Sequence, residues 1–284
     1  MQAQAIVKHG HQHRRGTRHK FGHETIFLQN NANHHVTHRE TSCGERLSAH
    51  IHQQVIVTPA AQDGTLARFD NGGQVVWRID PDPFAGFSGS TADGFRNALA
   101  AWNAESHTPI RLVMNGTSGL TAGFTTFDRQ NVLLFEDPNG DIEGDFSCST
   151  GGTLAIGGPW YDPDVTGRFN GETYIRIQGA DIVLNDGIGC LFERSTNPAK
   201  AFEELVGHET GHTLGLGHAS ENGGETNQTL RDALMYFRIH NDGRGARLAS
   251  DDIAGLRTLY DRTFSGGGGG GTGCGVDKLC LLNN

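Results

Sequence analysis

Three histidines fall within eleven residues at spacings that suit a metal site. Residues 208–218 read H-E-T-G-H-T-L-G-L-G-H. On a helix, residues four apart lie one turn apart on the same face, so His208 and His212 can bind one ion. Gly215 lets the chain leave the helix sharply, and His218 can then return as a third ligand. Three neutral imidazoles around a single Zn²⁺ leave the fourth tetrahedral position for water.

Glu209 adjoins the first of these histidines and suits the role of general base. On a helix it is rotated by about 100° from His208, so its carboxylate lies beside the metal rather than on it. Zinc lowers the pKa of a bound water to about 7, and Glu209 can take that proton. These residues therefore predict hydrolysis by a zinc-bound water, without an acyl-enzyme.

The motif resembles that of the metzincin metalloproteases, which also have a methionine turn beneath the zinc. Met235 lies seventeen residues after His218 and fits that turn. The resemblance extends to the matrixin branch over residues 70–262, and it implies an endopeptidase acting on an extended polypeptide. Three further segments resemble the first helix, the methionine turn and the last helix of matrixins: residues 95–102, 234–236 and 250–260.

The same resemblance implies that substrate pairs with an edge strand of the sheet by β-augmentation. The strand near 154–157 is the expected edge, and Gly157 and Gly158 would let a substrate backbone approach closely. Tyr236 could line the substrate pocket, donate a hydrogen bond to the tetrahedral intermediate, or pack as an ordinary aromatic residue.

Several positions depart from the vertebrate-type matrixin pattern. Ile156 stands where a histidine of the structural zinc site is expected, and His107 is the only histidine between residues 53 and 207. Phe237 replaces the proline that usually follows the methionine turn. We therefore expect one catalytic zinc, no second zinc built on histidines, and a divergent, bacterial-like member.

One acidic loop is a candidate calcium site. Hard cations such as Ca²⁺ prefer carboxylate and amide oxygens, but this loop lacks the full EF-hand spacing, so a solvated acidic turn is the alternative. The candidate ligands occupy alternate positions: Asp137, Asn139, Asp141, Glu143 and Asp145.

Five cysteines leave the redox state open. Cys148 could pair with Cys190, and Cys274 with Cys280, which leaves Cys43 over. Cys43 and the glycine after it match a matrixin cysteine switch in only two letters. Two disulfides would suit a secreted protein, although the N-terminus shows no apolar segment of a signal peptide.

The elements around the motif predict a mixed sheet with a few long helices, an α+β fold. The resemblance to metzincins implies that this sheet is twisted and has an edge strand at the cleft, and that the fold includes a long active-site helix, a methionine turn and a C-terminal helix. Helices are expected after Ser90, from Pro198 behind Asn197 as N-cap to Gly215, and from Ser250. Strands are expected at residues 75–80, 110–114, 131–135, 154–156 and 174–184.

Charge and composition divide the chain of 284 residues. Residues 1–52 carry ten of the 15 histidines and a net charge of +4, whereas the remainder carries −13. The overall charge of −9 argues against a nucleic-acid binder with a broad basic surface, and no apolar run reaches the length of a membrane span. The expected organisation is a disordered His-rich leader, a catalytic domain, a Gly-rich linker and the start of a possible truncated segment: residues 1–60, 65–264, 265–273 and 274–284.

Three function classes remain open at this point. The first is a secreted zinc endopeptidase, monomeric by default. The second is a metal-binding or partner-binding protein of protease ancestry without turnover. The third is a metal buffer that uses the histidines of residues 9–52.

Overall fold

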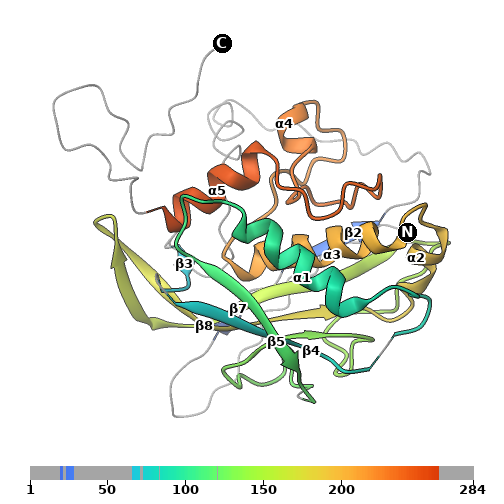
Figure 1. Cartoon of the computed structure of the whole chain (residues 1–284), viewed down its shortest axis with the longest axis horizontal. Coiled ribbons are helices and arrows are strands. Elements are labelled where there is room, and N and C mark those ends of the chain that lie inside the picture. The colour runs from blue at the N-terminus through green and yellow to red at the C-terminus, as the bar shows by residue number, and fades with distance from the viewer. Residues whose placement is uncertain are drawn as a thin grey trace, which may run out of the picture.

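The computed structural model describes residues 20–21, 24–28, 66–70, 73–82, 84–119 and 121–261. In this part of the chain one mixed sheet of eight strands has its long helices on one face (Figure 1). The predicted α+β fold class is confirmed. Among the described helices, none has the length and apolar character that crossing a bilayer requires.

The sheet runs in the order β1-β7-β8-β6-β4-β5, with β2 also paired to β7 and β3 to β8. Strands β8, β6, β4 and β5 run parallel to one another, whereas β7 is antiparallel to β8, β1 and β2. The strands are β1 (Lys20–Phe21), β2 (Glu24–Leu28), β3 (Ala67–Arg68), β4 (Gln74–Ile79), β5 (Arg111–Thr117), β6 (Asn131–Leu134), β7 (Gly152–Phe169) and β8 (Glu172–Leu184).

The three predicted helices begin where the sequence predicts, and two short helices, α2 and α4, were not predicted. Ser90 caps α1, because its hydroxyl accepts a hydrogen bond from the Asp93 N–H at 3.1 Å. Asn197 caps α3 in the same way, with Pro198 at the first helical position. The helices are α1 (Thr91–Asn103), α2 (Gly189–Arg194), α3 (Pro198–Thr213), α4 (Gln228–Arg231) and α5 (Ser250–Tyr260).

The main core lies between the sheet and helices α1 and α3. Trp77 of β4 packs edge-on against Phe95 of α1, with ring centroids 5.5 Å apart. Trp102 of α1 donates its indole N–H to the carbonyl oxygen of Gly207 at 2.9 Å, which ties α1 to α3. Every residue of α3 from 201 to 213 is buried, so the helix that carries the metal-binding motif is held on all sides.

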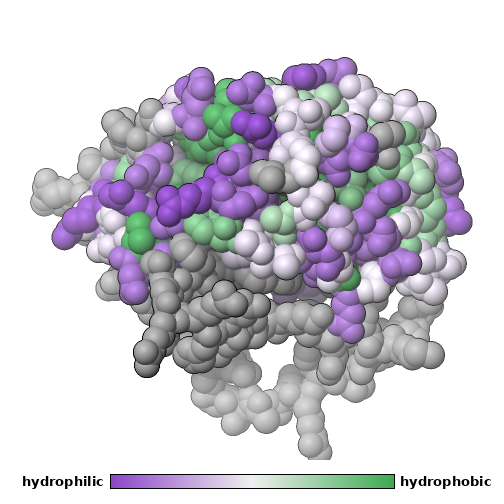
Figure 2. Space-filling view, turned by 90° about the horizontal axis from the view of Figure 1, so that it is seen from below, coloured by the Kyte–Doolittle hydropathy of each residue, from purple (hydrophilic) through white to green (hydrophobic). Residues whose placement is uncertain are grey.

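A smaller apolar cluster covers the other face of the sheet. Val132 and Val183 belong to it, whereas their chain neighbours Leu133 and Ile182 belong to the main core. This division follows from the alternation of side chains along a strand. On the coloured part of the surface seen from below, polar side chains are interspersed with apolar patches (Figure 2).

Strand β7 differs most from its prediction. The sequence predicts a short strand at 154–156 ending in a turn at Gly157-Gly158-Pro159, yet the strand continues to Phe169. Its residues 155–161 pair with β8, and the register shifts at Trp160 and beyond. Gly157 serves close packing against α3 instead of a turn, because a Cβ on it would lie 2.6 Å from the carbonyl oxygen of Glu209.

The predicted leader contains two described strands, β1 and β2, which differ from the expected lack of structure at residues 20–28. Both strands pair with the outer side of β7, so the predicted edge at 154–157 already has a neighbour. The other predicted features of the termini lie outside the described residues: the remaining leader, Cys43, Cys274, Cys280, the linker at 265–273 and the segment at 274–284.

Candidate metal centre

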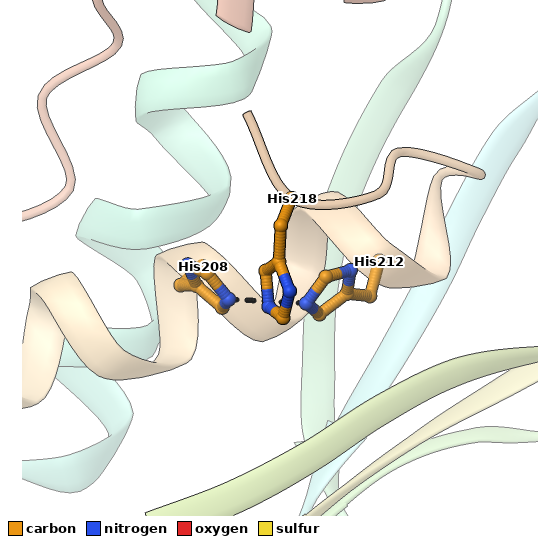
Figure 3. A group of neighbouring side chains, drawn as sticks. All are labelled: His208, His212 and His218. Carbon is orange, nitrogen blue, oxygen red and sulfur yellow. Dashed lines mark hydrogen bonds between the residues drawn. The ribbon is translucent and has the colours of Figure 1, made fainter. Parts of the chain in front are cut away.

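Three buried or nearly buried imidazoles converge at the end of α3. His208 and His212 lie one turn apart on the helix, and His218 comes back toward them from the segment that follows (Figure 3). The ring centroids are 4.7 to 5.2 Å apart. One potential ligand nitrogen from each ring lies within 4.8 Å of the other two. Within the described residues, this is the only such group of three or more metal-binding side chains.

The turn that returns His218 depends on Gly215. Its φ of +98° lies in the left-handed region that glycine adopts most easily. A Cβ at this position would also lie 2.3 Å from the carbonyl oxygen of Ala67. Gly215 therefore ends the helix and lets the chain pass close to β3.

Backbone carbonyls orient two of the three rings. The Nδ1 atom of His208 lies 2.7 Å from the carbonyl oxygen of Leu234, and that of His212 lies 2.8 Å from the carbonyl oxygen of Leu216. A carbonyl oxygen only accepts, so each Nδ1 carries the proton and each Nε2 presents a lone pair to the centre. This is the tautomer that a metal-binding imidazole requires.

The distance between two of these Nε2 atoms is close to the distance between two nitrogen ligands of a zinc ion. The two Nε2 atoms of His208 and His212 are 3.0 Å apart. Two nitrogen ligands in a tetrahedral zinc site, each about 2.0–2.1 Å from the ion, are about 3.3 Å apart. Burial, together with the nearby imidazole of His218, holds the pKa of His208 well below its usual value. The ring is therefore neutral at physiological pH, which is the form that binds a metal.

Glu209 is fully buried next to the first of these histidines on α3. Its backbone lies against Gly157 of β7, which fixes the position of the strand relative to the helix turn that bears the motif. Glu209 thus lies on α3 at the point where the helix contacts β7, the strand expected to hold substrate.

Met235 packs against the turn of α3 that bears the histidines. A Cβ on Gly211 would lie 2.2 Å from the sulfur of Met235, so the thioether touches α3 between His208 and His212. Asp252 of α5 holds this turn from below, because its carboxylate accepts the N–H groups of Leu234 at 2.8 Å and Met235 at 2.9 Å.

A model of the protein family described as matrixin matches residues 68–261. The chain belongs to the matrixin family. Members of this family are zinc metalloendopeptidases, and the histidine centre lies within the matched region.

Individual relatives are similar at modest identity. Metalloendoproteinase 5-MMP of Arabidopsis thaliana is 41% identical over 67 residues, which cover 24% of this chain and 16% of that protein. Metalloendoproteinase 1 of Glycine max is 27% identical over 188 residues, covering 66% and 50%. Human matrilysin is 26% identical over 167 residues, covering 58% and 48%. The chain thus spans half or less of the length of these relatives.

Residues after the methionine turn of this matrixin border the histidine centre. The ring of Phe237, which stands where matrixins usually have proline, lies 6.4 Å from the ring of His218, centroid to centroid. Tyr236 points its hydroxyl elsewhere and donates to the carbonyl oxygen of Asn222 at 2.9 Å. That hydrogen bond links the segment after His218 to the methionine turn.

The acidic loop of this matrixin uses at least two of its carboxylates to brace the backbone. Asp137 accepts from the N–H groups of Asp141 and Ile142, both at 2.8 Å, and Asp141 accepts from the Phe124 N–H at 3.1 Å. The side chains of Asp137, Asn139, Asp141, Glu143 and Asp145 do not form a metal-binding group among the described residues, so calcium stays a prediction.

One of the two predicted disulfides is present. Cys148, just before β7, is bonded to Cys190 of α2, with a Cα–Cα distance of 6.1 Å. The bond joins the loop ahead of the strand to the segment ahead of α3, and so connects the two elements that flank the centre.

Proposed function

We propose that this matrixin is a zinc-dependent endopeptidase that hydrolyses peptide bonds in extended polypeptides. The observation that carries the proposal is the converging set of imidazoles at His208, His212 and His218. Two of them are fixed by backbone carbonyls in the metal-binding tautomer, with Glu209 buried alongside. A structural histidine cluster would not require this common orientation of the ring nitrogens.

The three histidines would hold one zinc ion and leave a position open for water. Zinc bound there would polarise the scissile carbonyl and lower the pKa of the attacking water. Glu209 would act as the general base, holding the proton that the attacking water gives up and delivering it to the departing amine. Met235 packs under the ligands and keeps their orientation, and Gly157 keeps β7 beside the reacting groups.

Substrate would lie extended along β7, with main-chain hydrogen bonds supplying affinity. The strand passes the helix at Gly157, directly against Glu209, so a peptide paired there would run past the centre. We place Tyr236 and Phe237 at the border of the substrate pocket. The Cys148–Cys190 disulfide supports a site of action outside the cell, since disulfides persist in oxidising compartments.

The decisive test compares the full chain with Glu209→Gln. Metal analysis should give one zinc per chain for both proteins, because Glu209 is not a ligand. Cleavage of a broad peptide library should fall by 10²–10⁴-fold in the variant, the usual contribution of a general base. His107→Gln, which changes a histidine outside the centre, is the matched control and should retain both properties.

The alternative function, a metal-binding or partner-binding protein without turnover, predicts a different result. It predicts the same zinc content but no cleavage that depends on Glu209. A His-rich metal buffer predicts several zinc ions per chain and persistence of that binding after His208→Asn. Either result would overturn the endopeptidase proposal.

A further inference from the structure

His240 lies between two hydrogen-bond acceptors, a few residues after the methionine turn. Its Nδ1 atom is 2.6 Å from a carboxylate oxygen of Glu204, and its Nε2 atom is 2.6 Å from the carbonyl oxygen of Arg231. A carbonyl oxygen and an ionised carboxylate only accept, so each ring nitrogen carries a proton. The geometry therefore describes a charged imidazolium, unlike the neutral rings that suit a metal ligand.

Glu204 receives three donors from the segment that contains His240. Its Oε1 atom accepts the backbone N–H of His240 at 2.7 Å as well as the ring, and its Oε2 atom accepts the N–H of Asn241 at 3.0 Å. The side chain of Glu204 is 2% exposed and that of His240 is 13% exposed. Because N–H groups only donate, all three contacts suit an ionised carboxylate. Glu204 and His240 therefore form a buried salt bridge.

This salt bridge attaches the segment to the active-site helix. Glu204 lies on α3 four residues before His208, one turn away on the same face. The ring of His240 also bonds to Arg231, the last residue of α4, and so holds the loop that precedes the methionine turn. One imidazolium thus connects α3, α4 and the chain between them and α5.

Buried carboxylates hold both ends of the segment that borders the histidine centre. Asp252 of α5 accepts the N–H of Met235 at the start of the segment. Glu204 of α3 accepts the N–H groups of His240 and Asn241 at its end. Residues 236–239 lie between these two anchors, so their position depends on both.

Ring contacts lead from His240 toward the candidate metal ligands. The ring of His240 lies 6.2 Å from that of Tyr236, centroid to centroid, and the Tyr236 ring lies 5.0 Å from that of Phe237. The Phe237 ring in turn lies 6.4 Å from that of His218. A shift of His240 would therefore move the two aromatic residues proposed to border the substrate pocket.

We propose that charged His240 is a positioning residue for substrate binding, which holds residues 236–240 against α3 and so keeps the border of the substrate pocket in place. This inference rests on the proposed endopeptidase function. A neutral imidazole has a single N–H, so loss of the proton sets a lone pair of the ring against either Glu204 or the Arg231 carbonyl. One of the two contacts then breaks, and peptide affinity should fall by roughly 3- to 10-fold, the equivalent of one net hydrogen bond.

The surroundings of the ring favour its protonated form. Burial opposes the charge, but the hydrogen bonds to Glu204 and to the Arg231 carbonyl outweigh it, and the pKa of His240 lies above its usual value. Arg244 acts in the opposite direction, although it is itself paired with Asp242 at 2.7 Å. Other titratable groups act on the ring or share the cavity of about 630 Å³ beside it: His208, Glu225, Arg231, Asp232, Tyr236, Arg238 and Asp252. Affinity should therefore fall as pH rises through the pKa of His240.

The first test detects the charge of His240 without any activity. Histidine-selective NMR of the zinc-loaded full chain follows each imidazole with pH, and His240→Gln identifies the signal. We expect an apparent pKa above 6.5 that falls in Glu204→Gln, where the carboxylate is lost. Glu203→Gln is the matched control, because it removes a neighbouring buried carboxylate of α3 that contacts Lys200 and Asn97 instead. It should leave the pKa of His240 unchanged.

The second test measures peptide binding against pH. The zinc-loaded Glu209→Gln variant binds with little cleavage, so it can report the Kd of a fluorescent peptide that the parent chain cleaves. We expect this Kd to rise by roughly 3- to 10-fold as pH passes the pKa of His240. Adding His240→Gln should give weak binding without that step, and the titration of groups shared by the two proteins cancels in the comparison. Saturating peptide should also raise the apparent pKa of His240, because linkage is reciprocal.

The outcomes separate this inference from the endopeptidase proposal. An apparent pKa of His240 at or below 6.5, or one that Glu204→Gln leaves unchanged, overturns the assigned salt bridge whether or not the protein cleaves peptides. A binding curve without the step, or with an equal step after His240→Gln, overturns the positioning role and leaves the endopeptidase in place. If the zinc-loaded parent chain cleaves no peptide, the endopeptidase proposal fails, and the positioning role fails with it even where the NMR titration is as expected.

Discussion

Gly157 of β7 touches the backbone of Glu209 on α3. A Cβ built on Gly157 would lie 2.6 Å from the carbonyl oxygen of Glu209 and 2.9 Å from its Cβ. Glycine is the one residue that lets strand and helix approach this closely. The contact sets the distance between the edge of β7, where a peptide would pair, and the carboxylate that would take the proton from water.

Gly157→Ala should therefore damage both stability and catalysis. The clash is with backbone atoms, which no rotamer change relieves, so helix and strand must move apart. We expect the free energy of unfolding to fall by about 1–3 kcal/mol, as for other overpacked sites, and kcat/KM to fall with it. Urea denaturation and peptide cleavage measure the two effects.

Gly73→Ala is the control for this prediction, because no atom lies within 4 Å of its added Cβ. Equal losses in Gly157→Ala and Gly73→Ala would contradict the role assigned to the contact between Gly157 and Glu209.

Asp252 is a second residue whose side chain should affect the histidine centre, because it holds the methionine turn. Its two carboxylate oxygens accept three backbone N–H groups, from Leu234, Met235 and Ala249 at 2.7–2.9 Å. An asparagine has a single acceptor oxygen, so Asp252→Asn leaves at least one buried donor without its acceptor. We expect a loss of about 1–3 kcal/mol in the free energy of unfolding and weaker zinc affinity through a looser methionine turn.

Asp93→Asn is the matched change for this prediction. Asp93 is also in the first turn of a helix, but its side chain is 70% exposed and paired with Arg96. Exposed pairs of this kind contribute at most about 1 kcal/mol. Denaturation by urea and competition with a zinc chelator would compare the variants. If Asp252→Asn resembles Asp93→Asn in both measurements, Asp252 does not support the methionine turn.

Local sequence signals carried most of the correct predictions. The caps at Ser90 and Asn197 and the glycine at 215 act on neighbouring residues, so the starts of α1 and α3 and the end of α3 just before Gly215 follow from the sequence. The spacing of His208 and His212 depends only on helix geometry, and the structure brings their rings together. These features can be predicted without knowing which distant segments pack against them.

Contacts between distant segments could not be predicted in this way. The carbonyl oxygen of Leu234, which orients His208, lies 26 residues away along the chain. Asp252 lies in the first turn of α5, where an acidic residue complements the helix dipole from the surface, yet it is 2% exposed. The pairing of β2 with β7 depends on the whole fold of the sheet, and a short apolar run in a polar leader gives little sign of it.

The Cys148–Cys190 disulfide should contribute a large share of the stability. It closes a loop with a sequence separation of 42, for which chain entropy predicts a stabilisation of about 4 kcal/mol. Cys148→Ser/Cys190→Ser should lower the free energy of unfolding by roughly 2–4 kcal/mol in urea denaturation. A reductant should produce the same loss in the parent chain and little further loss in the double variant. A reductant-sensitive double variant would show that another bond is responsible.

Asp181 gives the fold a defined pH dependence. It is 2% exposed on β8, where it accepts hydrogen bonds from the indole N–H of Trp160 at 2.8 Å and the Val132 N–H at 3.1 Å. Burial, reinforced by nearby acidic groups, raises the pKa of Asp181 to about 7, above about 3.9 in the unfolded chain. Between pH 4 and 7 Asp181 therefore loses its proton first in the unfolded chain, and the free energy of unfolding should fall as pH rises, by at most roughly 4 kcal/mol.

Asp181→Asn mimics the neutral acid and should remove this slope, whereas Asp164→Asn on the exposed part of β7 should keep it. Urea denaturation of the metal-free proteins from pH 4 to 8 measures the difference, in which the titration of the shared histidines cancels. Parallel slopes for the parent chain and Asp181→Asn would show that Asp181 is ionised in the folded protein.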